Sequence, residues 1–126
     1  MSNTTPSAVM NADKFLKKTF YVVFTRPVAA WEEIAKVIPE HLAYQVDLER
    51  RGIMFGAGPL SAESAEPRGR GMVIIRASSF EEAKAIADAD PMHKTGVRSY
   101  TIDRWTMNEG SVTVRITYSD QRMTLE

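Results

Sequence analysis

One segment limits the possible folds more than any other: residues 19–25, TFYVVFT, are almost entirely aromatic or β-branched. Such residues favour an extended strand, and the Arg-Pro pair that follows ends it, because proline cannot donate to a strand ladder. Alternate side chains of a strand point to opposite faces, so Phe20 and Val22 share one face and Tyr21 and Val23 the other. Both faces are apolar. A strand of this kind needs cover on both sides of its sheet.

The following segments alternate between helical and extended patterns. Apolar residues fall at helical spacing in residues 28–51, and again in residues 80–89, which begin after a serine cap. Residues 53–60, 72–77 and 97–107 have the apolar and β-branched composition of strands. The order strand-helix-strand-strand-helix-strand predicts the α+β class, specifically a ferredoxin-like antiparallel sheet with two helices on one face.

The C-terminal part predicts one more strand. Residues 111–118 alternate apolar and polar side chains, and the Asn-Glu-Gly sequence at 108–110 is typical of a turn. We therefore expect a hairpin between residues 97–107 and 111–118, which adds a C-terminal strand to the sheet.

The domain organisation follows from these patterns. The 126 residues suffice for one domain with one core. Residues 1–18 are predicted to be a flexible or loosely docked N-terminal tail, residues 19–107 the ferredoxin-like domain, and residues 108–126 a C-terminal hairpin strand and tail.

The exposed side of the sheet indicates an assembly. Two helices cover one face only, whereas residues 19–25 and 72–77 are apolar on both faces. We therefore expect the second face to be buried against another copy of the chain, as a sheet-to-sheet homodimer.

Composition excludes several classes of function. Sixteen basic and sixteen acidic side chains cancel, so no net field attracts nucleic acid or an anionic membrane. The absence of cysteine excludes disulfides and thiolate nucleophiles. No metal-binding or cofactor-binding motif occurs, and no apolar leader or membrane span is visible. We expect a cytoplasmic protein without a metal or organic cofactor, with an unknown small molecule as its ligand.

Pro39 interrupts the first helical pattern and leaves two alternatives open. It either kinks one long helix or occupies the first position of a second helix, where its missing N–H costs nothing. In the second case His41 lies near a helix N-terminus, whose dipole favours the neutral imidazole that a general base requires. The alternative is a purely structural role, in which His41 lies at the core boundary and bonds to a backbone carbonyl.

Asp90 also has two interpretations. Aspartate before proline commonly starts a turn and accepts hydrogen bonds from nearby N–H groups. Alternatively, the carboxylate of Asp90 holds the ring of His41 in one tautomer, as the acidic member of a catalytic triad does. The other histidine, His93, is predicted to lie on an exposed loop without a special role.

The glycine-rich segment after the first helix is a candidate binding wall. Gly56 and Gly58 indicate a bulge or a close approach to the backbone. A phosphate loop is excluded because Pro59 lacks an N–H and no helix with Gly-Lys-Ser/Thr follows. Together with Ser61, at the start of the polar connector, these residues are predicted to bind the substrate.

The segments around these candidates resemble the YciI-like, or YCII-related, family. Residues 39–44 (PEHLAY) and 49–60 (ERRGIMFGAGPL) are similar to its "H-L … G-x-L-x-x-A-G-P" stretch. Residues 80–91, which end in Ala-Asp-Ala-Asp-Pro, are similar to its second signature, with Gly-Val beyond. The resemblance implies a ferredoxin-like dimer with an active-site cleft and a His-Asp pair that maps onto His41 and Asp90.

The resemblance also limits the reaction class. The family includes a chloromuconolactone dehalogenase, and its fold is similar to muconolactone isomerase. This implies acid–base isomerisation or elimination on a lactone or carbonyl compound. In our enzyme hypothesis, backbone N–H groups near Gly56 and Gly58 stabilise a developing enolate oxygen. The long tail and the added strand depart from smaller members, so the substrate is not transferred. The alternative is a non-catalytic dimeric module that binds a metabolite or another protein.

Overall fold

The computed structural model of the chain describes residues 12–63 and 69–125. They divide into two compact units, of which residues 19–106 form the larger. The smaller unit contains the described residues on either side of that range. It includes the short 3₁₀ helix η1 (Ala12–Lys14), and the backbone N–H of Leu16 donates to the carbonyl of Asn108 at 3.2 Å. The remainder of the predicted N-terminal tail, residues 1–11, lies outside the described residues.

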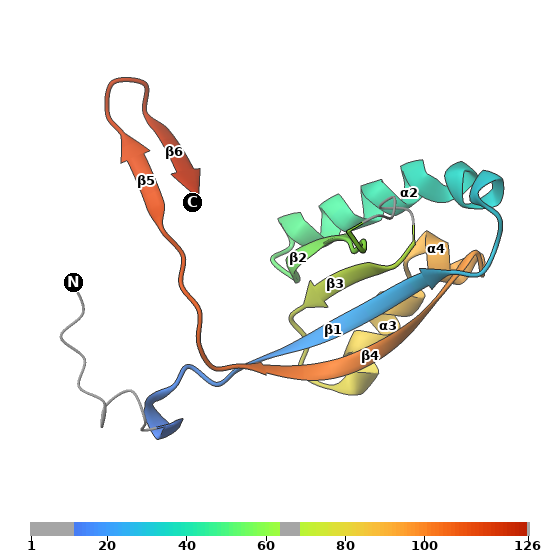
Figure 1. The fold of residues 1–126 in the computed structure, drawn as a ribbon, viewed down its shortest axis with the longest axis horizontal. Helices are drawn as coiled ribbons and strands as arrows, with labels where there is room; N and C mark the ends of the chain where they lie inside the picture. Colours follow the sequence, from blue (N-terminus) through green and yellow to red (C-terminus); the bar gives the residue numbers. More distant parts are fainter. Residues whose placement is uncertain (1–11, 64–68, 126) are drawn as a thin grey trace. The chain divides into compact units, whose positions relative to one another are not determined.

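The larger unit is built on a four-stranded sheet in the order β2-β3-β1-β4, and β3 pairs antiparallel with both of its neighbours (Figure 1). This confirms the predicted α+β class with an antiparallel sheet, and the strand order is consistent with a ferredoxin-like fold. The elements follow in the order β1 (Lys18–Pro27), α2 (Trp31–Arg50), β2 (Met54–Pro59), β3 (Gly71–Ile75), α3 (Phe80–Asp88), α4 (Pro91–Lys94) and β4 (Arg98–Met107).

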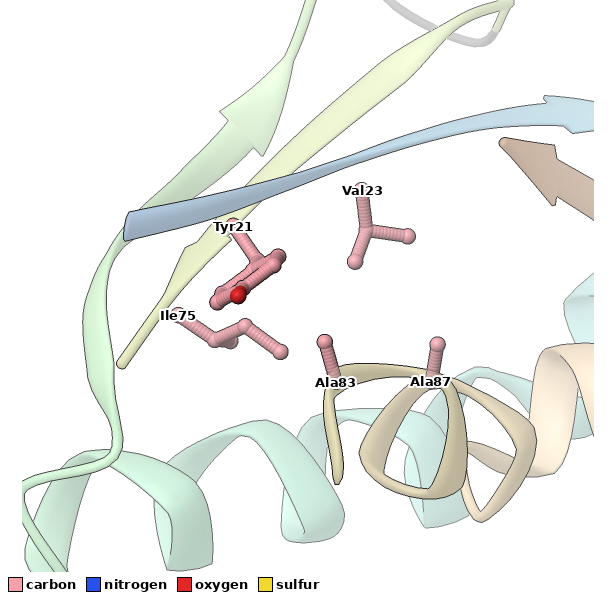
Figure 2. Packing of buried hydrophobic residues seen from close by; sticks show 5 residues of the cluster. All are labelled: Tyr21, Val23, Ile75, Ala83 and Ala87. Carbon is pink, nitrogen blue, oxygen red and sulfur yellow. The ribbon is translucent and has the colours of Figure 1, made fainter. Parts of the chain in front are cut away.

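The core lies between the sheet and the helices. Tyr21 and Val23 of β1 and Ile75 of β3 pack against Ala83 and Ala87 of α3 (Figure 2). The two alanines have short side chains, so α3 approaches the strands closely while the larger residues of the sheet fill the space between them. Figure 2 also shows α2 behind α3, on the same side of the strands. One face of the sheet is thus covered by helices.

The opposite face of the sheet carries an aromatic cluster. The ring of Phe20 lies 4.6 Å from that of Phe55 and 5.7 Å from that of Trp105, between centroids. The guanidinium of Arg76 lies over Phe20 and Phe55, at 5.7 and 5.6 Å from the ring centroids. Phe20 is only 2% exposed. The chain's own side chains therefore supply part of the cover that this face requires.

The first helical segment is a single helix. Pro39 lies inside α2, so the alternative of a second helix that begins at Pro39 is excluded. Proline has no N–H to donate to the carbonyl of Ala35, but the helix continues on both sides of it. Its end is as expected: Gly52 follows with a left-handed φ of +72°. Within the described part of the chain, no helix is both long and apolar enough to cross a bilayer.

The predicted C-terminal addition to the sheet is wrong. Residues 111–118 do not form a hairpin with residues 97–107. Instead, β5 (Val114–Thr117) pairs antiparallel with β6 (Arg122–Leu125) in a separate two-stranded sheet.

A tight turn that contains no glycine explains this pairing. The carboxylate of Asp120 accepts a hydrogen bond from the backbone N–H of Arg122 at 3.2 Å and another from the hydroxyl of Thr117. Gln121 adopts a left-handed φ of +53°. The Asn-Glu-Gly sequence was predicted to form the turn of a hairpin. The turn between two paired strands is instead formed around Asp120, whose side chain accepts a hydrogen bond from the nearby backbone.

Replacement of Ile75 by alanine tests the core. Ile75 is completely buried, so Ile75→Ala should lower the free energy of unfolding by about 2–5 kcal/mol, through lost burial and the cavity left behind. Urea unfolding followed by circular dichroism measures this loss. The matched control is Ile116→Ala, at a side chain that is 61% exposed, which should change stability by less than about 0.5 kcal/mol. Equal losses for the two variants would contradict this assignment of the core.

Candidate functional site

A cleft of about 430 Å³ opens in the larger unit between α2 and the adjoining ends of β2 and β3. Apolar residues from one side of α2 form much of its wall: Trp31, Ile34, Ile38, Leu42 and Val46. Polar side chains also line it: His41 and Gln45 from α2 itself, and Thr25, Asp90, His93 and Arg98 from other parts of the unit. An apolar cleft with a few polar groups is typical of a site for a small organic molecule.

The structure brings together the two residues predicted to be catalytic. Nδ1 of His41 lies 2.9 Å from each oxygen of the Asp90 carboxylate, although the residues are 49 positions apart. An ionised carboxylate only accepts hydrogen bonds, so Nδ1 carries the proton and donates it. In the neutral ring, Nε2 then keeps its lone pair. The His41 side chain lines the cleft and is 25% exposed, so it is accessible to a ligand.

Asp90 is held by three donors at once. Besides His41, the backbone N–H of Met92 donates to Oδ1 and the amide of Gln45 donates to Oδ2, each at 2.9 Å. Asp90 is 3% exposed, and burial by itself raises the pKa of its carboxyl group. The hydrogen bonds from His41 and Met92 act in the opposite direction and prevail, so the pKa lies below its usual value. Asp90 is therefore ionised at neutral pH.

Both interpretations of Asp90 thus hold geometrically. It is the N-cap of the short helix α4, with Pro91 as the first helical residue, and it also bonds to His41. The position of His41 differs from one expectation, because it lies in the middle of α2. The N-terminus of its own helix, at Trp31, is not beside the ring, and the bond to Asp90 sets the tautomer instead.

His93 was predicted to lie on an exposed loop, and this is wrong. It lies on α4, is half-buried, and lines the cleft. Its Nδ1 lies 2.7 Å from the carbonyl of Ala87, which can only accept, so Nδ1 carries a proton. Its Nε2 lies 2.9 Å from the hydroxyl of Thr25. A helix of four residues gives no periodic signal, and the sequence therefore did not reveal this position.

Arg98 is a further polar group that sequence reasoning missed. Its Nε donates to the hydroxyl of Thr25 at 3.0 Å, and its Nη2 donates to the carbonyls of Thr25 (3.0 Å) and Gly69 (2.7 Å). Burial lowers the pKa of Arg98, while the charge of Asp90 opposes this effect. Gly71 leaves room for the arrangement, because a Cβ at that position would lie 3.0 Å from the Thr25 methyl group. Thr25 and Arg98 are 73 positions apart, so no local pattern links them.

Only two of the four residues predicted to bind the substrate line the cleft. Gly58 and Pro59 line the cleft, whereas Gly56 and Ser61 are not among the residues that line it. Gly56 instead marks a register shift between β2 and β3, as its bulge-forming potential indicated. Substrate binding by these four residues remains a prediction.

The arrangement is suited to proton transfer. His41 lines the cleft, no partner of its Nε2 is found among the described residues, and the ionised Asp90 stabilises the imidazolium that forms when a proton is taken up. Among residues 12–63 and 69–125, no group of three or more histidine, aspartate or glutamate side chains is arranged to hold a metal ion.

Comparison with known structures supports the fold. The chain is similar to 5-chloro-2-hydroxyhydroquinone dehydrochlorinase from Burkholderia phenoliruptrix, solved in complex with 2,5-dihydroxybenzoquinone. The similarity has a TM-score of 0.58 at 18% sequence identity, and covers 69% of this chain and 93% of the dehydrochlorinase. At this identity the likeness shows the fold alone.

Comparison by sequence gives the family. No curated protein matches the chain significantly. The family model of the YCII-related domain matches residues 19–106, the same range as the larger compact unit and 70% of the chain's length. The match confirms the resemblance found in the motifs. This chain belongs to the YCII-related domain family.

Proposed function

We propose that this chain is an enzyme that acts on a small organic molecule by acid–base chemistry, without a cofactor. His41 is the proton-transfer group and Asp90 its orienting partner. The observation that carries the proposal is the hydrogen bond from Nδ1 of His41 to the buried Asp90, in the wall of a largely apolar cleft.

The proposed step is removal of a proton from a carbon next to a carbonyl group. Nε2 of His41 takes the proton, and the electron pair of the C–H bond moves toward the carbonyl to form an enolate. Loss of a leaving group from the adjacent carbon then completes an elimination, whereas return of the proton at another carbon completes an isomerisation. The positive charge on His41 is balanced by Asp90 throughout.

Two observations favour this class of reaction. The dehydrochlorinase with the similar fold removes hydrogen chloride from a hydroxylated ring compound, as its name states, and such an elimination includes a proton abstraction. The cleft wall is apolar, and Leu42 and Val46 are 54% and 42% exposed. A ligand with a carbon ring would cover these side chains and gain affinity from their burial.

Substitution of the pair tests the proposed function. His41→Ala and Asp90→Asn should each lower kcat by about 10²–10⁴-fold, the usual contribution of a positioned acid–base group. Substrates come from a thermal-shift screen of lactones, keto acids and hydroxylated ring compounds, followed by a product assay on each hit. The matched control is Asp88→Asn, an exposed carboxylate of α3 that is bonded to Lys84 and does not line the cleft. It should leave kcat unchanged.

The outcomes of this experiment separate enzyme from binding module. If kcat is unchanged in both His41→Ala and Asp90→Asn, these two residues do not take part in the reaction. Ligands that bind to the cleft, with no product detected for any of them, would favour the non-catalytic metabolite-binding alternative.

The pH dependence of stability tests the state of Asp90. Its pKa in the folded chain lies below the ordinary value of 3.8. The stability contributed by the ionised group is therefore complete above this ordinary value, and is lost as the pH falls below it through the folded pKa. The difference in unfolding free energy between wild type and Asp90→Asn should be largest near neutrality and should shrink below the ordinary pKa.

Urea unfolding at a series of pH values from neutral to about 3 measures this difference. The control is Asp103→Asn, an exposed carboxylate on β4. A difference for Asp90→Asn that stays constant across the whole range would mean that Asp90 has the same pKa in the folded and unfolded chain.

We also propose that the enzyme is a homodimer that associates through the sheet face opposite α2 and α3. Phe24 and Phe55 remain 39% and 45% exposed there, and Phe55 lies against the buried Phe20. Light scattering at micromolar concentration should give about twice the chain mass of 14.1 kDa.

Phe24→Asp should shift the mass toward the monomer, because a charge would be buried at the interface. Val28→Asp, at a position that is 61% exposed beyond the end of β1, should leave the mass unchanged. A monomeric wild type would refute the dimer without affecting the proposed chemistry.

A further inference from the structure

The Arg98 side chain is fixed at the wall of the cleft with part of its hydrogen-bonding capacity unused. A guanidinium has five N–H groups. The structure assigns the one on Nε and the two on Nη2 to Thr25 and Gly69. For the two on Nη1, no acceptor is found among the described residues. The side chain is therefore held rigidly while one end of it remains able to donate.

The charge of Arg98 also has no direct counter-ion in the described part of the chain. Its partners there are a hydroxyl group and two carbonyl groups, all of them neutral. Asp90 acts on Arg98 electrostatically without an ion pair between them, and the Asp90 carboxylate is already engaged by His41, Gln45 and Met92. A half-buried guanidinium of this kind interacts more strongly with an anion than a fully hydrated one does.

We propose that Arg98 is an anion-binding residue, and that the ligand of the cleft is a small cyclic organic anion. Nη1 of Arg98 donates to an ionised oxygen of the ligand, such as a carboxylate or enolate oxygen, and the ring lies against the apolar wall formed by α2. The inference rests on the proposed function only in taking this cleft as the binding site. It adds the substrate class: compounds with an ionised oxygen are preferred over neutral ones of the same shape.

Other charged groups line the same cleft and bear on this preference. Arg70 is exposed, and no anchoring hydrogen bond of its side chain is found among the described residues, so it contributes a mobile and hydrated charge. Glu49 is exposed as well and weakly repels an anion. His41 attracts an anion only when its ring is protonated. These groups provide the controls that separate Arg98 from a general electrostatic effect.

Benzoate and its neutral counterpart benzamide test the proposal, with the full chain and isothermal titration. Wild type should bind benzoate at least about tenfold more tightly than benzamide, which is the ordinary effect of one charged hydrogen bond. In Arg98→Met the Kd of benzoate should rise by about tenfold or more, and that of benzamide should change by less than about twofold. Arg70→Gln removes the same charge from the cleft and should change both constants by less than about threefold.

Arg98 also joins β1 to β4 and to the segment before β3, and a purely structural role is the competing explanation. In that case Arg98→Met weakens benzoate and benzamide equally, and the proposal fails. Equal binding of the two compounds by wild type overturns it as well, and this comparison needs no variant to fold. If Arg98→Met does not fold, Arg98→Lys keeps the charge but loses the anchored geometry, and should lower the preference for benzoate.

The proposed chemistry and the proposed anion preference can be refuted independently of each other. His41→Ala should lower kcat by about 10²–10⁴-fold yet keep the preference for benzoate, because Arg98 is untouched. Loss of that preference in His41→Ala would assign the anion to a protonated His41 and refute the role of Arg98. Conversely, turnover that survives His41→Ala and Asp90→Asn, with the benzoate preference intact, would refute the chemistry and leave the anion site standing.

Discussion

The buried carboxylate of Asp90 organises the site. It accepts hydrogen bonds from two side chains of α2, His41 and Gln45, and from the backbone of Met92 on α4. An ionised group this deeply buried is stable only when each of its oxygens is bonded, so the two helices must meet at this point. The same bonds keep the carboxylate ionised and orient the His41 ring. The same hydrogen bonds thus hold α2 and α4 together and set the orientation of the His41 ring.

A second network determines the other part of the cleft. Thr25, near the end of β1, accepts from Arg98 and bonds to His93, whose second ring nitrogen donates to the carbonyl of Ala87. Since Arg98 already donates to the Thr25 hydroxyl, the hydroxyl's own proton is available to Nε2 of a neutral His93. His93 is therefore fixed in one tautomer with both nitrogens engaged, whereas among the described residues only Nδ1 of His41 has a partner. This difference makes His41 the proton-transfer group of our proposal and His93 a support.

Local patterns in the sequence were sufficient to predict most of the strands and helices of the larger unit. The residues of β1 are apolar on both faces, and the structure covers one face with α3 and part of the other with the aromatic cluster around Phe20. The helix over residues 80–89 began at the serine cap, where Ser79 accepts from the backbone of Glu82. The C-terminal hairpin was mispredicted because its turn depends on hydrogen bonds that the Asp120 side chain accepts, and an aspartate is a weaker sequence signal than a glycine.

The sequence by itself determined the four strands and two longer helices of the larger unit, their order and the family, because caps, periodicity and motifs are properties of neighbouring residues. It also supplied His41 and Asp90, through the family resemblance rather than through spacing. Only the tertiary structure decided that these two groups meet, that Pro39 lies within one helix, and that Thr25, Gln45, His93 and Arg98 share their cleft. The reason is physical: hydrogen bonds across 45 to 73 positions depend on how the helices pack against the sheet, and no local pattern encodes that packing.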